Sequence, residues 1–466
     1  MAENSSEVLG LRISKKGITK VQATILLVLI VVVVGAVGYY YSVPRAPEVK
    51  EIKIGLLYPL TGPLATLGTE ECDASKMAID MINERGGIKG YKVSYVVADA
   101  KSDPKVAASE AERLCTIEKV PIIVGTYSSA LLLAASEVAE KYKTIYWEVG
   151  AITEQATLRG YKYLFRPEII GSDYGYISAK FVVEKIAPAI GLKPSEIRVA
   201  IIHEDGPYGV SVADGNEFMC KKEGLNVVLK EGYSTKATDL SYLILKLIAE
   251  KPHVIMATSY FTDAALIFRQ AKELGLKVKA FIGHSAGYAD PATYKTLGED
   301  ITYVFNVGVT TCWINPDALL PEVGKILKEY IDRWQKKFGK DPLVEAMIAF
   351  GHTWLLMTDI LPRTIEKYGA VNAENVRKAA YETNVPEGGT ILGWGVRFST
   401  PEKPEDTDIG KIIRADKPQL HVNQNVKTFP VVAQWYPGGK LVVVWPDKFA
   451  YKPAVIPLPP QSPYAG

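Results

Sequence analysis

Hydrophobic residues follow two alternating patterns along most of the chain. Short apolar runs rich in valine and isoleucine alternate with longer segments in which apolar residues recur every three or four positions. The short runs are typical of buried strands, and the longer segments are typical of amphipathic helices. The first pair is a strand expected at residues 52–58 and a helix expected at residues 65–85.

The same alternation continues in two series. The first predicts strands at 91–98, 120–124 and 144–147 and helices at 104–118 and 128–142. The second predicts strands at 198–203, 226–231, 253–257 and 279–282 and helices at 210–223, 239–250 and 263–275. Such alternation forms parallel sheets that are covered on both faces. We therefore expect an α/β protein with two doubly wound, Rossmann-like parallel-sheet lobes, and a ligand where the carboxyl ends of their strands meet.

The last third of the chain has a different pattern. It is mostly helical from residue 316, with helices expected at 316–338, 342–368 and 372–382. Two strands follow at 429–437 and 440–446, joined by a Gly438-Gly439 turn. The proline-rich residues 447–466 are expected to form an extended tail.

The loop at residues 59–64 has two interpretations. It ends where a helix begins, so its backbone amides are in position to hold a small anion. An ordinary turn between a strand and a helix has the same pattern, and we favour this second interpretation.

One segment lies outside the alternation. Residues 21–43 are 23 residues without a charge, which is long enough to cross a bilayer as a helix. Lys15, Lys16 and Lys20 precede this run, so residues 1–20 are expected in the cytoplasm and the bulk of the chain outside the cell. A cleaved secretory peptide is the alternative, but the run ends in three tyrosines and not in a small-residue cleavage site. We expect a transmembrane signal anchor at 21–43 and a tether at 44–50.

Composition excludes some classes of partner. With 466 residues, 48% of them hydrophobic, the chain can bury a large core and form two or three domains. The formal net charge is +2, without a basic block beyond the N-terminus, which argues against nucleic acid. Four cysteines, Cys72, Cys115, Cys220 and Cys312, are too sparse for a disulfide framework or a CxxC metal site. They are expected to be buried thiols, and one disulfide stays open for an exported domain.

Several enzyme motifs are missing. The first strand–helix turn has no GxGxxG, and the chain contains neither HExxH nor GxxxxGK[ST]. The five histidines are scattered, and none lies at metal-ligand spacing from another. We therefore expect a protein that is not an enzyme and that uses no metal and no cofactor.

Seven segments carry a resemblance to a known family. They are IGLLYPLTGPLATLG at 54–68, GGIKGYKV at 86–93, DAKSDPKVA at 99–107, IVGTYSSA at 123–130, RGYKYLFRP at 159–167, HEDGPYG at 203–209 and FRQAKELGLK at 268–277. In this order they resemble the extracellular substrate-binding proteins of branched-chain amino-acid (Leu/Ile/Val-type) ABC transporters, over residues 52–446. The resemblance implies a periplasmic-binding-protein type I fold, in which two lobes joined by three crossover strands close on a ligand. Lobe one would hold residues 52–170 and 308–392, and lobe two residues 171–307 and 393–446.

A shorter resemblance concerns the N-terminus. Residues 16–19, KGIT, resemble the pilin-like signal of some archaeal solute-binding proteins, which is cut after the glycine, here Gly17. Residues 1–20 are therefore either a cytoplasmic segment or a leader that is cleaved.

The first part of the expected ligand site lies at the start of a helix in lobe one. Residues 125–129 follow a buried strand and open the helix, so Ser128, the Ser129 hydroxyl and the neighbouring amides are placed to hold a carboxylate. The resemblance implies this role for Ser129. The alternative is a serine that only caps the helix.

A second loop of lobe one is expected at the same site. The resemblance implies that Gly150 and Ala151 contact the carboxylate through their backbone, although the hydroxyl usual in the next position is replaced by Ile152. Glu148 lies just before them and is expected to line the pocket, with a solvated surface glutamate as the alternative.

Lobe two contributes aromatic rings and one departure from the family. The resemblance implies that Tyr208 and Tyr260 cover the ligand, for which tyrosine offers a large apolar face and a hydroxyl. Ser285 stands where the family usually has a glutamate that pairs with the ammonium group of the ligand. Either Glu148 replaces that partner, or the ligand has no α-ammonium group.

The implied function is the capture of a small solute, an amino acid or a related carboxylate or amide, for delivery to the transmembrane subunits of an ABC permease. The alternative is a sensor module that acts through a separate membrane signalling partner. Residues 1–20 are too short to be a signalling domain themselves.

Overall fold

The computed structural model describes residues 19–42 and 50–466. It divides the chain into two units, residues 1–50 and residues 51–466. The described part of the first unit is helix α1 (Lys20–Ser42), which coincides with the predicted apolar helix. Val43, the predicted cleavage site at Gly17 and the tether up to residue 49 lie outside the described residues.

Length and composition single out one described helix that could cross a membrane, Val344–Tyr368. Its apolar window is 83% buried inside the protein, as expected for a core helix of a folded domain. The apolar part of α1, Lys20–Ala36, is shorter.

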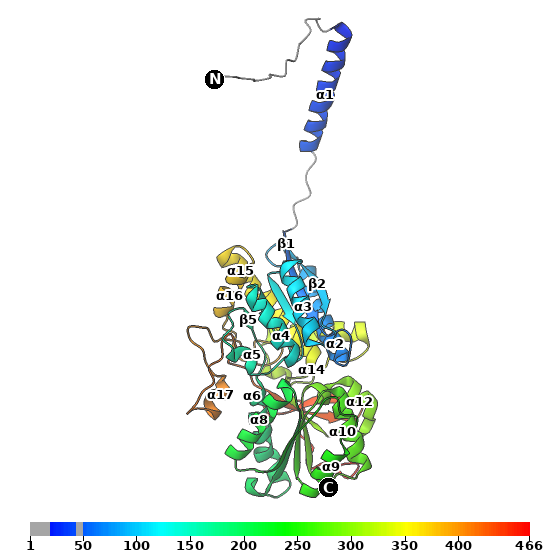
Figure 1. Ribbon diagram of the computed structural model, residues 1–466, viewed down its shortest axis with the longest axis vertical. Coiled ribbons are helices and arrows are strands. Elements are labelled where there is room, and N and C mark those ends of the chain that lie inside the picture. Colours follow the sequence, from blue (N-terminus) through cyan, green and yellow to red (C-terminus); the bar gives the residue numbers. More distant parts are fainter. Residues whose placement is uncertain (1–18, 43–49) are drawn as a thin grey trace, which may run out of the picture. The chain divides into compact units, whose positions relative to one another are not determined.

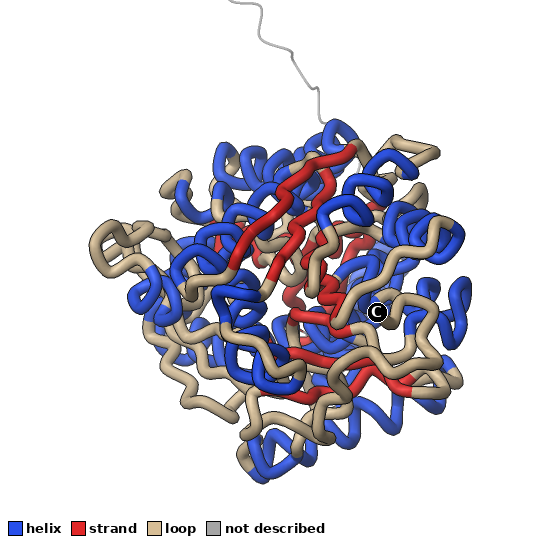
Figure 2. Tube along the Cα trace, turned by 90° about the horizontal axis from the view of Figure 1, so that it is seen from below, coloured by secondary structure: helices blue, strands red, loops and turns tan. Residues whose placement is uncertain are grey.

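The second unit consists of two α/β lobes, each built on one sheet (Figure 1). Lobe one has a five-stranded sheet in the order β2-β1-β3-β4-β5, in which β1, β3, β4 and β5 pair in parallel. Its strands are β1 (Lys50–Tyr58), β2 (Tyr91–Asp99), β3 (Ile122–Gly125), β4 (Ile145–Trp147) and β5 (Leu164–Phe165). Figure 2 shows the strands of both sheets surrounded by helices, which confirms the predicted α/β class.

Strand β1 shows why this sheet is covered on both faces. Ile54, Leu56 and Tyr58 belong to one hydrophobic cluster, together with residues of α2 (Ala65–Glu84) and α14 (Val344–Leu355). Leu57, which points the other way, belongs to a second cluster with α3 (Pro104–Thr116) and α4 (Ser129–Lys141). Side chains alternate between the faces of a strand, so a strand that is apolar at nearly every position must be buried on both sides.

Lobe two has a seven-stranded sheet in the order β12-β11-β10-β9-β8-β6-β7. Its strands are β6 (Arg198–Glu204), β7 (Asn226–Tyr233), β8 (Val254–Thr258), β9 (Ala280–His284), β10 (Phe305–Gly308), β11 (Val431–Tyr436) and β12 (Lys440–Trp445). The sheet is parallel from β10 to β7, as expected, and at one edge β11 pairs antiparallel with both β10 and β12. The physical reason is the short Gly438-Gly439 turn, since a tight hairpin joins only antiparallel strands.

Helices cover the sheet of lobe two on both sides (Figure 1). Helices α6 (Gly171–Phe181) and α8 (Pro207–Lys222) lie on one side, and α9 (Ser241–Glu250) and α10 (Phe261–Glu273) lie on the other. The shorter helices of this unit are α5 (Gln155–Leu158), α7 (Ala187–Ala189), α11 (Ala286–Ala289), α12 (Pro291–Leu297) and α17 (Asp408–Ile413).

The predicted helical region after residue 316 is present with two changes of detail. Helix α13 (Pro321–Phe338) starts five residues later than expected, because Pro321 begins it and a short 3₁₀ turn, Pro316–Ala318, precedes it. Helix α14 continues through the π-helical residues Leu356–Ile360 into α15 (Leu361–Tyr368), and α16 (Ala373–Tyr381) follows.

The chain passes between the two sheets three times, after β5, after β10 and before β11. These connections form isolated β-bridges, such as the one between Arg166 and Gln424, and none of the strands β1–β12 lies in them. Buried side chains hold them together instead. The Arg166 guanidinium donates to Gln424 Oε1 over 2.7 Å, and Asn425 Nδ2 donates to the carbonyls of Pro167 and Gly395.

Two segments differ from the expected division into lobes. Residues 393–428 were expected in lobe two, but Phe398 packs against Trp147 and Phe165 of lobe one, and only the two strands after residue 430 join the second sheet. The tail does not extend away from the protein. Its Tyr464 is 1% exposed beside Phe268, and Ala465 bridges to Val278, because this ring finds an apolar surface on lobe two.

Candidate ligand-binding site

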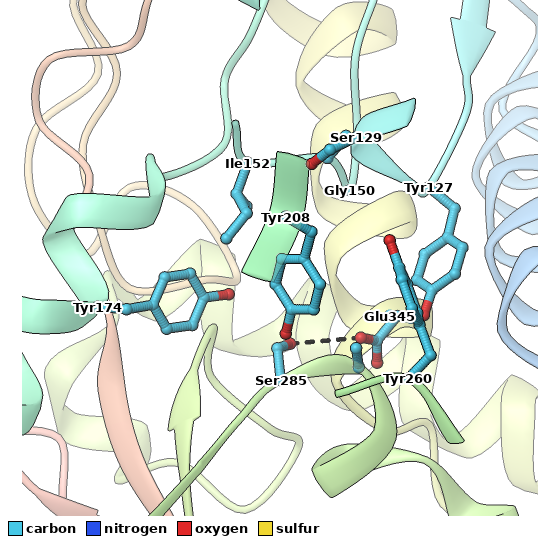
Figure 3. A pocket seen from close by; sticks show the side chains of 11 residues that line it. Tyr127, Ser129, Gly150, Ile152, Tyr174, Tyr208, Tyr260, Ser285 and Glu345 are labelled. Atoms are coloured by element: carbon cyan, nitrogen blue, oxygen red, sulfur yellow. Dashed lines mark hydrogen bonds between the residues drawn. The ribbon is translucent and has the colours of Figure 1, made fainter. Parts of the chain in front are cut away.

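A pocket lies where the two lobes face each other, and Figure 3 shows its side chains. Eleven residues line it: Tyr127, Ser129, Gly150, Ala151, Ile152, Tyr174, Tyr208, Tyr260, Ser285, Ala286 and Glu345. The space between their atoms is about 290 Å³. Because the lining comes from both lobes, a small molecule bound here would lie between them.

The lining residues come mostly from loops that follow strands. The loops after β3 and β4 supply the residues of lobe one, and the loops after β6, β8 and β9 supply Tyr208, Tyr260 and Ser285 of lobe two. Tyr174 lies on α6 and Glu345 lies on α14. The pocket is therefore at the carboxyl ends of the parallel strands, as the strand–helix alternation predicts.

The structure gathers seven of the nine predicted site residues around this pocket. These seven are Ser129, Gly150, Ala151, Ile152, Tyr208, Tyr260 and Ser285. Ser128 and Glu148 do not line it. The sequence analysis missed the other four, namely Tyr127, Tyr174, Ala286 and Glu345.

Ser128 and Ser129 have different roles at the start of α4. Ser128 caps the helix, since its Oγ accepts a hydrogen bond from the Leu131 amide over 3.4 Å. Ser129 Oγ accepts one from the Thr153 amide over 3.3 Å, which leaves the hydroxyl proton of Ser129 to donate into the pocket. The positive end of the α4 dipole lies at the same place, so this end of the pocket favours an anionic group.

Glu148 does not line the pocket, and its carboxylate is bonded within lobe one. Its Oε1 accepts hydrogen bonds from the amides of Gly150 and Ala151, both over 2.8 Å, and its Oε2 accepts one from the Thr126 amide over 3.1 Å. Burial raises the pKa of Glu148 to about 7, although these hydrogen bonds act in the opposite direction. Both oxygens are occupied, so Glu148 ties the two lobe-one loops together. The expected backbone contacts of Gly150 and Ala151 with a ligand carboxylate are also lost, because Glu148 takes both amides.

Two glycines allow these loops to approach other atoms closely. Gly125 has a φ of +144°, and a Cβ there would lie 1.9 Å from the Leu57 carbonyl oxygen. A Cβ on Gly150 would lie 2.3 Å from Oε1 of Glu71. Any larger residue at either position would therefore displace a loop that forms the pocket.

Tyrosine rings form much of the wall. The ring centroids of Tyr208 and Tyr260 lie 5.3 Å apart, and those of Tyr127 and Tyr260 lie 6.2 Å apart with their planes at 67°. Burial raises the pKa of all three phenols well above the usual value, so they stay neutral. The Tyr208 hydroxyl donates to the His284 carbonyl, which fixes that ring against β9.

Glu345 brings a carboxylate into this wall. It lies in the first turn of α14 and is 3% exposed, and its Oε1 accepts a hydrogen bond from Ser285 Oγ over 3.3 Å. Burial, together with the nearby Asp290 and Glu70, raises the pKa of Glu345 to about 8. In the sequence, Glu345 could have been noticed as the single acidic residue in the apolar run LVEAMIAF at residues 343–350.

Ser285 lies in a strained turn. Its φ is 34°, as is that of Ala286, and Tyr127 across the pocket has a φ of 88°. Such left-handed backbone in residues other than glycine costs of order 1–3 kcal/mol each and concentrates at functional sites. The strain here presents these residues to the pocket.

The Ser285 turn also contains an enzyme motif that the sequence-based exclusion overlooks. Residues 283–287, GHSAG, have the GxSxG spacing of a hydrolase nucleophile elbow. A serine nucleophile needs a histidine base within hydrogen-bond reach. The His284 ring instead bonds Ser178 Oγ and the Ala257 carbonyl, and among the described histidines none hydrogen-bonds Ser285. The turn presents Ser285 without activating it.

The loop at residues 59–64 is an ordinary turn. The Asp99 carboxylate accepts hydrogen bonds from the amides of Leu60 and Thr61 and from the Thr61 hydroxyl. Ser102 Oγ accepts one from the Leu64 amide. Because these amides are already bonded, the loop is not an anion site.

Metal and thiol chemistry find little support in the described part of the chain. No three His, Cys, Asp or Glu side chains in residues 19–42 and 50–466 cluster so as to hold a metal ion. The four cysteines all lie in the described ranges and are unpaired, with Cys72 and Cys220 buried. Burial raises the pKa of Cys72 to about 11, as expected of an inert thiol.

Comparisons with known proteins agree with this architecture. The chain matches the periplasmic binding protein family over residues 51–403. It is 35% identical over 407 residues to Leu/Ile/Val-binding protein homolog 8 of Brucella abortus (strain 2308), which covers 86% of this chain and 92% of that protein.

Solved structures with the same fold include two with bound ligands. LivJ, the branched-chain amino acid transporter substrate-binding protein of Streptococcus pneumoniae, contains isoleucine and is 22% identical, with a TM-score of 0.66 over 85% of this chain and 100% of that chain. A solute-binding protein of an ABC transporter from Rhodopseudomonas palustris BisB5 contains 3,4-dihydroxybenzoic acid and is 18% identical, with a TM-score of 0.66 over 87% of this chain and 98% of that chain. At these identities the likeness shows the fold. The chain belongs to the periplasmic binding protein family, with the type I fold and in the group of the Leu/Ile/Val-binding protein homologues.

Proposed function

We propose that this protein is a membrane-anchored, extracellular solute-binding protein of an ABC importer, which captures a small solute between its lobes and delivers it to the permease. The observation that carries the proposal is that one pocket takes its walls from both lobes. A solute in it contacts Ser129 on one side and Tyr208, Tyr260 and Ser285 on the other.

This arrangement couples binding to closure of the lobes. When the lobes separate, each keeps only half of the wall, so the full set of contacts exists only in the closed form. A solute then shifts the population toward that form. The closed surface is what a permease would recognise, and the three connections between the lobes, expected as crossover strands, would act as the hinge.

The pocket suits an amino acid or a related carboxylate or amide. Ser129 and the positive end of α4 favour a carboxylate, and the tyrosine rings enclose an apolar body. The ligands of these two solved structures, isoleucine and 3,4-dihydroxybenzoic acid, both carry a carboxylate. This common feature supports Ser129 as the anion-binding residue.

The anchor is proposed from α1. Its residues Lys20–Ser42 are helical, and lysines precede the apolar run. Under the positive-inside rule the second unit would then lie on the outer face of the cell membrane. Recovery of the protein in the membrane fraction after an alkaline carbonate wash would support the anchor, and its release would contradict it.

The experiment that tests solute binding is a thermal unfolding screen of the full-length protein in detergent, followed by the fluorescence of its seven tryptophans. The panel contains amino acids, amides, aromatic acids, short peptides, nucleosides and sugars. A solute at a hundred times its Kd stabilises the protein by about 2.7 kcal/mol, which raises the melting temperature visibly. Ser129→Ala and Tyr260→Ala should each raise the Kd of a solute found in this way. Unchanged Kd values in both variants would contradict the site.

A sensor module is the alternative function. Both functions use the same pocket, so the distinction lies in the partner. Crosslinking in intact cells, with and without solute, should capture permease subunits for an importer. Capture of a chemoreceptor or a kinase would favour the sensor.

A further inference from the structure

The structure brings a carboxylate next to Ser285, the position at which the resemblance implies a glutamate. Ser285 stands where the resemblance implies an ammonium-binding glutamate, and its Oγ donates to Glu345 Oε1 over 3.3 Å. The two residues are 60 positions apart and come from different elements, the turn after β9 and the first turn of α14. A carboxylate therefore reaches the same part of the pocket from the other lobe.

Glu345 has one oxygen left for a ligand. Its Oε1 is bonded by Ser285, whereas its Oε2 has no hydrogen-bond partner within the described part of the chain. The side chain is 3% exposed and lines the pocket. Leaving a buried acceptor unpaired is unfavourable, and more so when it is charged, so a donor on the ligand would be strongly favoured here.

The acidic side chains around Glu345 favour a positively charged group on the ligand. Asp290 and Glu70 lie close enough to raise its pKa, and its own charge acts in the same way on Glu71 and Glu168. Of the described residues that line the pocket, none is Lys, Arg or His. Like charges gathered in a buried region repel one another unless a cation joins them. Lys340 pairs with Glu70 at the edge of this group, so beside Glu345 itself a cationic group of the solute would be favoured.

Tyrosine rings surround the same end of the pocket. The Glu345 charge, together with burial, raises the pKa of Tyr127, Tyr174 and Tyr208, so all three lie near it. Figure 3 shows the Glu345 carboxylate beside the ring of Tyr260. The faces of aromatic rings attract cations, and an ammonium group is held well by rings together with a carboxylate.

We propose that Glu345 binds the ammonium group of the solute, and that the solutes of this protein are therefore amines that also carry a carboxylate, as α-amino acids do. This inference rests on the proposed function of the pocket. Ser129 and Glu345 lie at opposite ends of the group of side chains in Figure 3, so one end takes the anionic group and the other takes the cation.

The test uses pairs of probes that differ only in the amine. Leucine is compared with 4-methylpentanoate, and phenylalanine with 3-phenylpropanoate. Their Kd values are measured by calorimetry on the full-length protein in detergent. With the wild type, the amino acid of at least one pair should bind at least tenfold more tightly than its partner. With Glu345→Gln, the Kd of that amino acid should rise at least tenfold and the difference within the pair should disappear.

Three further variants control for effects on folding. Asp173→Asn removes another fully buried carboxylate, which also has one oxygen without a partner in the described part of the chain but does not line the pocket, and it should change the Kd by less than threefold. Glu345→Asp keeps the charge and should restore part of the affinity that Glu345→Gln loses. Glu345→Ala should bind as weakly as Glu345→Gln. The melting temperature of each empty variant shows whether it is folded.

The outcomes separate this inference from the proposed function. If amino acids bind equally well to the wild type and to folded Glu345→Gln, the assignment of Glu345 is overturned. If only solutes without an amine bind, the assignment also falls, whereas solute binding stands. If no solute of the wider panel binds, both proposals fail together.

Discussion

At the residue level, two buried carboxylates near the pocket have opposite roles. Both oxygens of Glu148 accept hydrogen bonds from backbone amides, whereas Glu345 has one oxygen without a partner. Burial raises the pKa of both, to about 7 and about 8 respectively. The number of bonded oxygens, and not burial, therefore distinguishes the residue that positions loops from the residue that is available to a ligand.

The raised pKa of Glu345 predicts how binding depends on pH. In the empty protein this group is largely protonated below pH 8, and an ammonium group pairs with its ionised form, so binding releases a proton. The affinity for an amino acid should rise by up to about tenfold per pH unit between pH 6 and pH 8, and then level off. Calorimetry at several pH values in buffers of different ionisation enthalpy measures the affinity and the released proton.

Other acidic groups face Glu345, and burial raises their pKa values as well. They are Asp290 at the start of α12, Glu70 and Glu71 on α2, and Glu168 on the connection after β5, while the tyrosines of the wall stay neutral. The variant Glu345→Gln separates their contribution, because the part of the pH dependence of the affinity that is due to Glu345 should vanish in it. A slope that survives the substitution would assign the pH dependence to one of the neighbours.

Glu148 carries a prediction about stability. Glu148→Ala would leave the amides of Thr126, Gly150 and Ala151 without an acceptor. Each unpaired buried amide costs about 1–3 kcal/mol, so the variant should lose roughly 3 kcal/mol or more of unfolding free energy and also bind solute more weakly. Urea unfolding followed by tryptophan fluorescence measures the loss. A variant as stable as the wild type would show that Glu148 does not hold the two loops.

At the level of elements, the site is assembled from the ends of helices and strands. Helices α4, α8 and α10 start at the pocket, with caps at Ser128, Gly206 and Tyr260. Their N-terminal ends offer positive dipole potential near the ligand. Helix α14 is the exception that supplies a negative charge, from Glu345 in its first turn.

The connections between the lobes carry a prediction at this level. Asn425 is fully buried, and its side-chain amide donates to the carbonyls of Pro167 and Gly395. Asn425→Ala should therefore cost about 2–4 kcal/mol, since two buried carbonyls lose their donors. Asn226→Ala, at an exposed position, is the matched control and should cost less than about 0.5 kcal/mol. Equal unfolding free energies for the two variants would show that Asn425 does not hold the connection.

For the second unit as a whole, the pocket between two lobes predicts closure. Small-angle scattering of the full-length protein in a nanodisc, with contrast matched to the disc, should give a smaller radius of gyration once a solute identified by the unfolding screen is added. Ser129→Ala at the same solute concentration should show a smaller change. An unchanged radius in the wild type would mean that the lobes do not move on binding.

The sequence alone determined the features that depend on local patterning. Apolar periodicity predicted ten of the twelve described strands and missed β5, β10 and helix α6, because burial of a face is recorded in residue spacing only where an element is long and one-sided. The alternation of strands and helices placed the ligand at the carboxyl ends of the strands, and the resemblance to the family pointed to Ser129, Gly150, Tyr208 and Ser285 there, all of which line the pocket. The resemblance gave the family, which the comparisons confirmed.

Only the tertiary structure decided what depends on contacts between distant residues. Glu345 reaches Ser285 across 60 positions, and Glu148 turns to the amides of its own loops. Phe398 packs on lobe one, Thr407 and Arg414 bond α6 of lobe two, and Tyr464 brings the tail onto lobe two. Periodicity reports that a side chain is buried, but not which surface it meets or whether a carboxylate there is bonded. These are long-range contacts, and they fix the chemistry of the pocket.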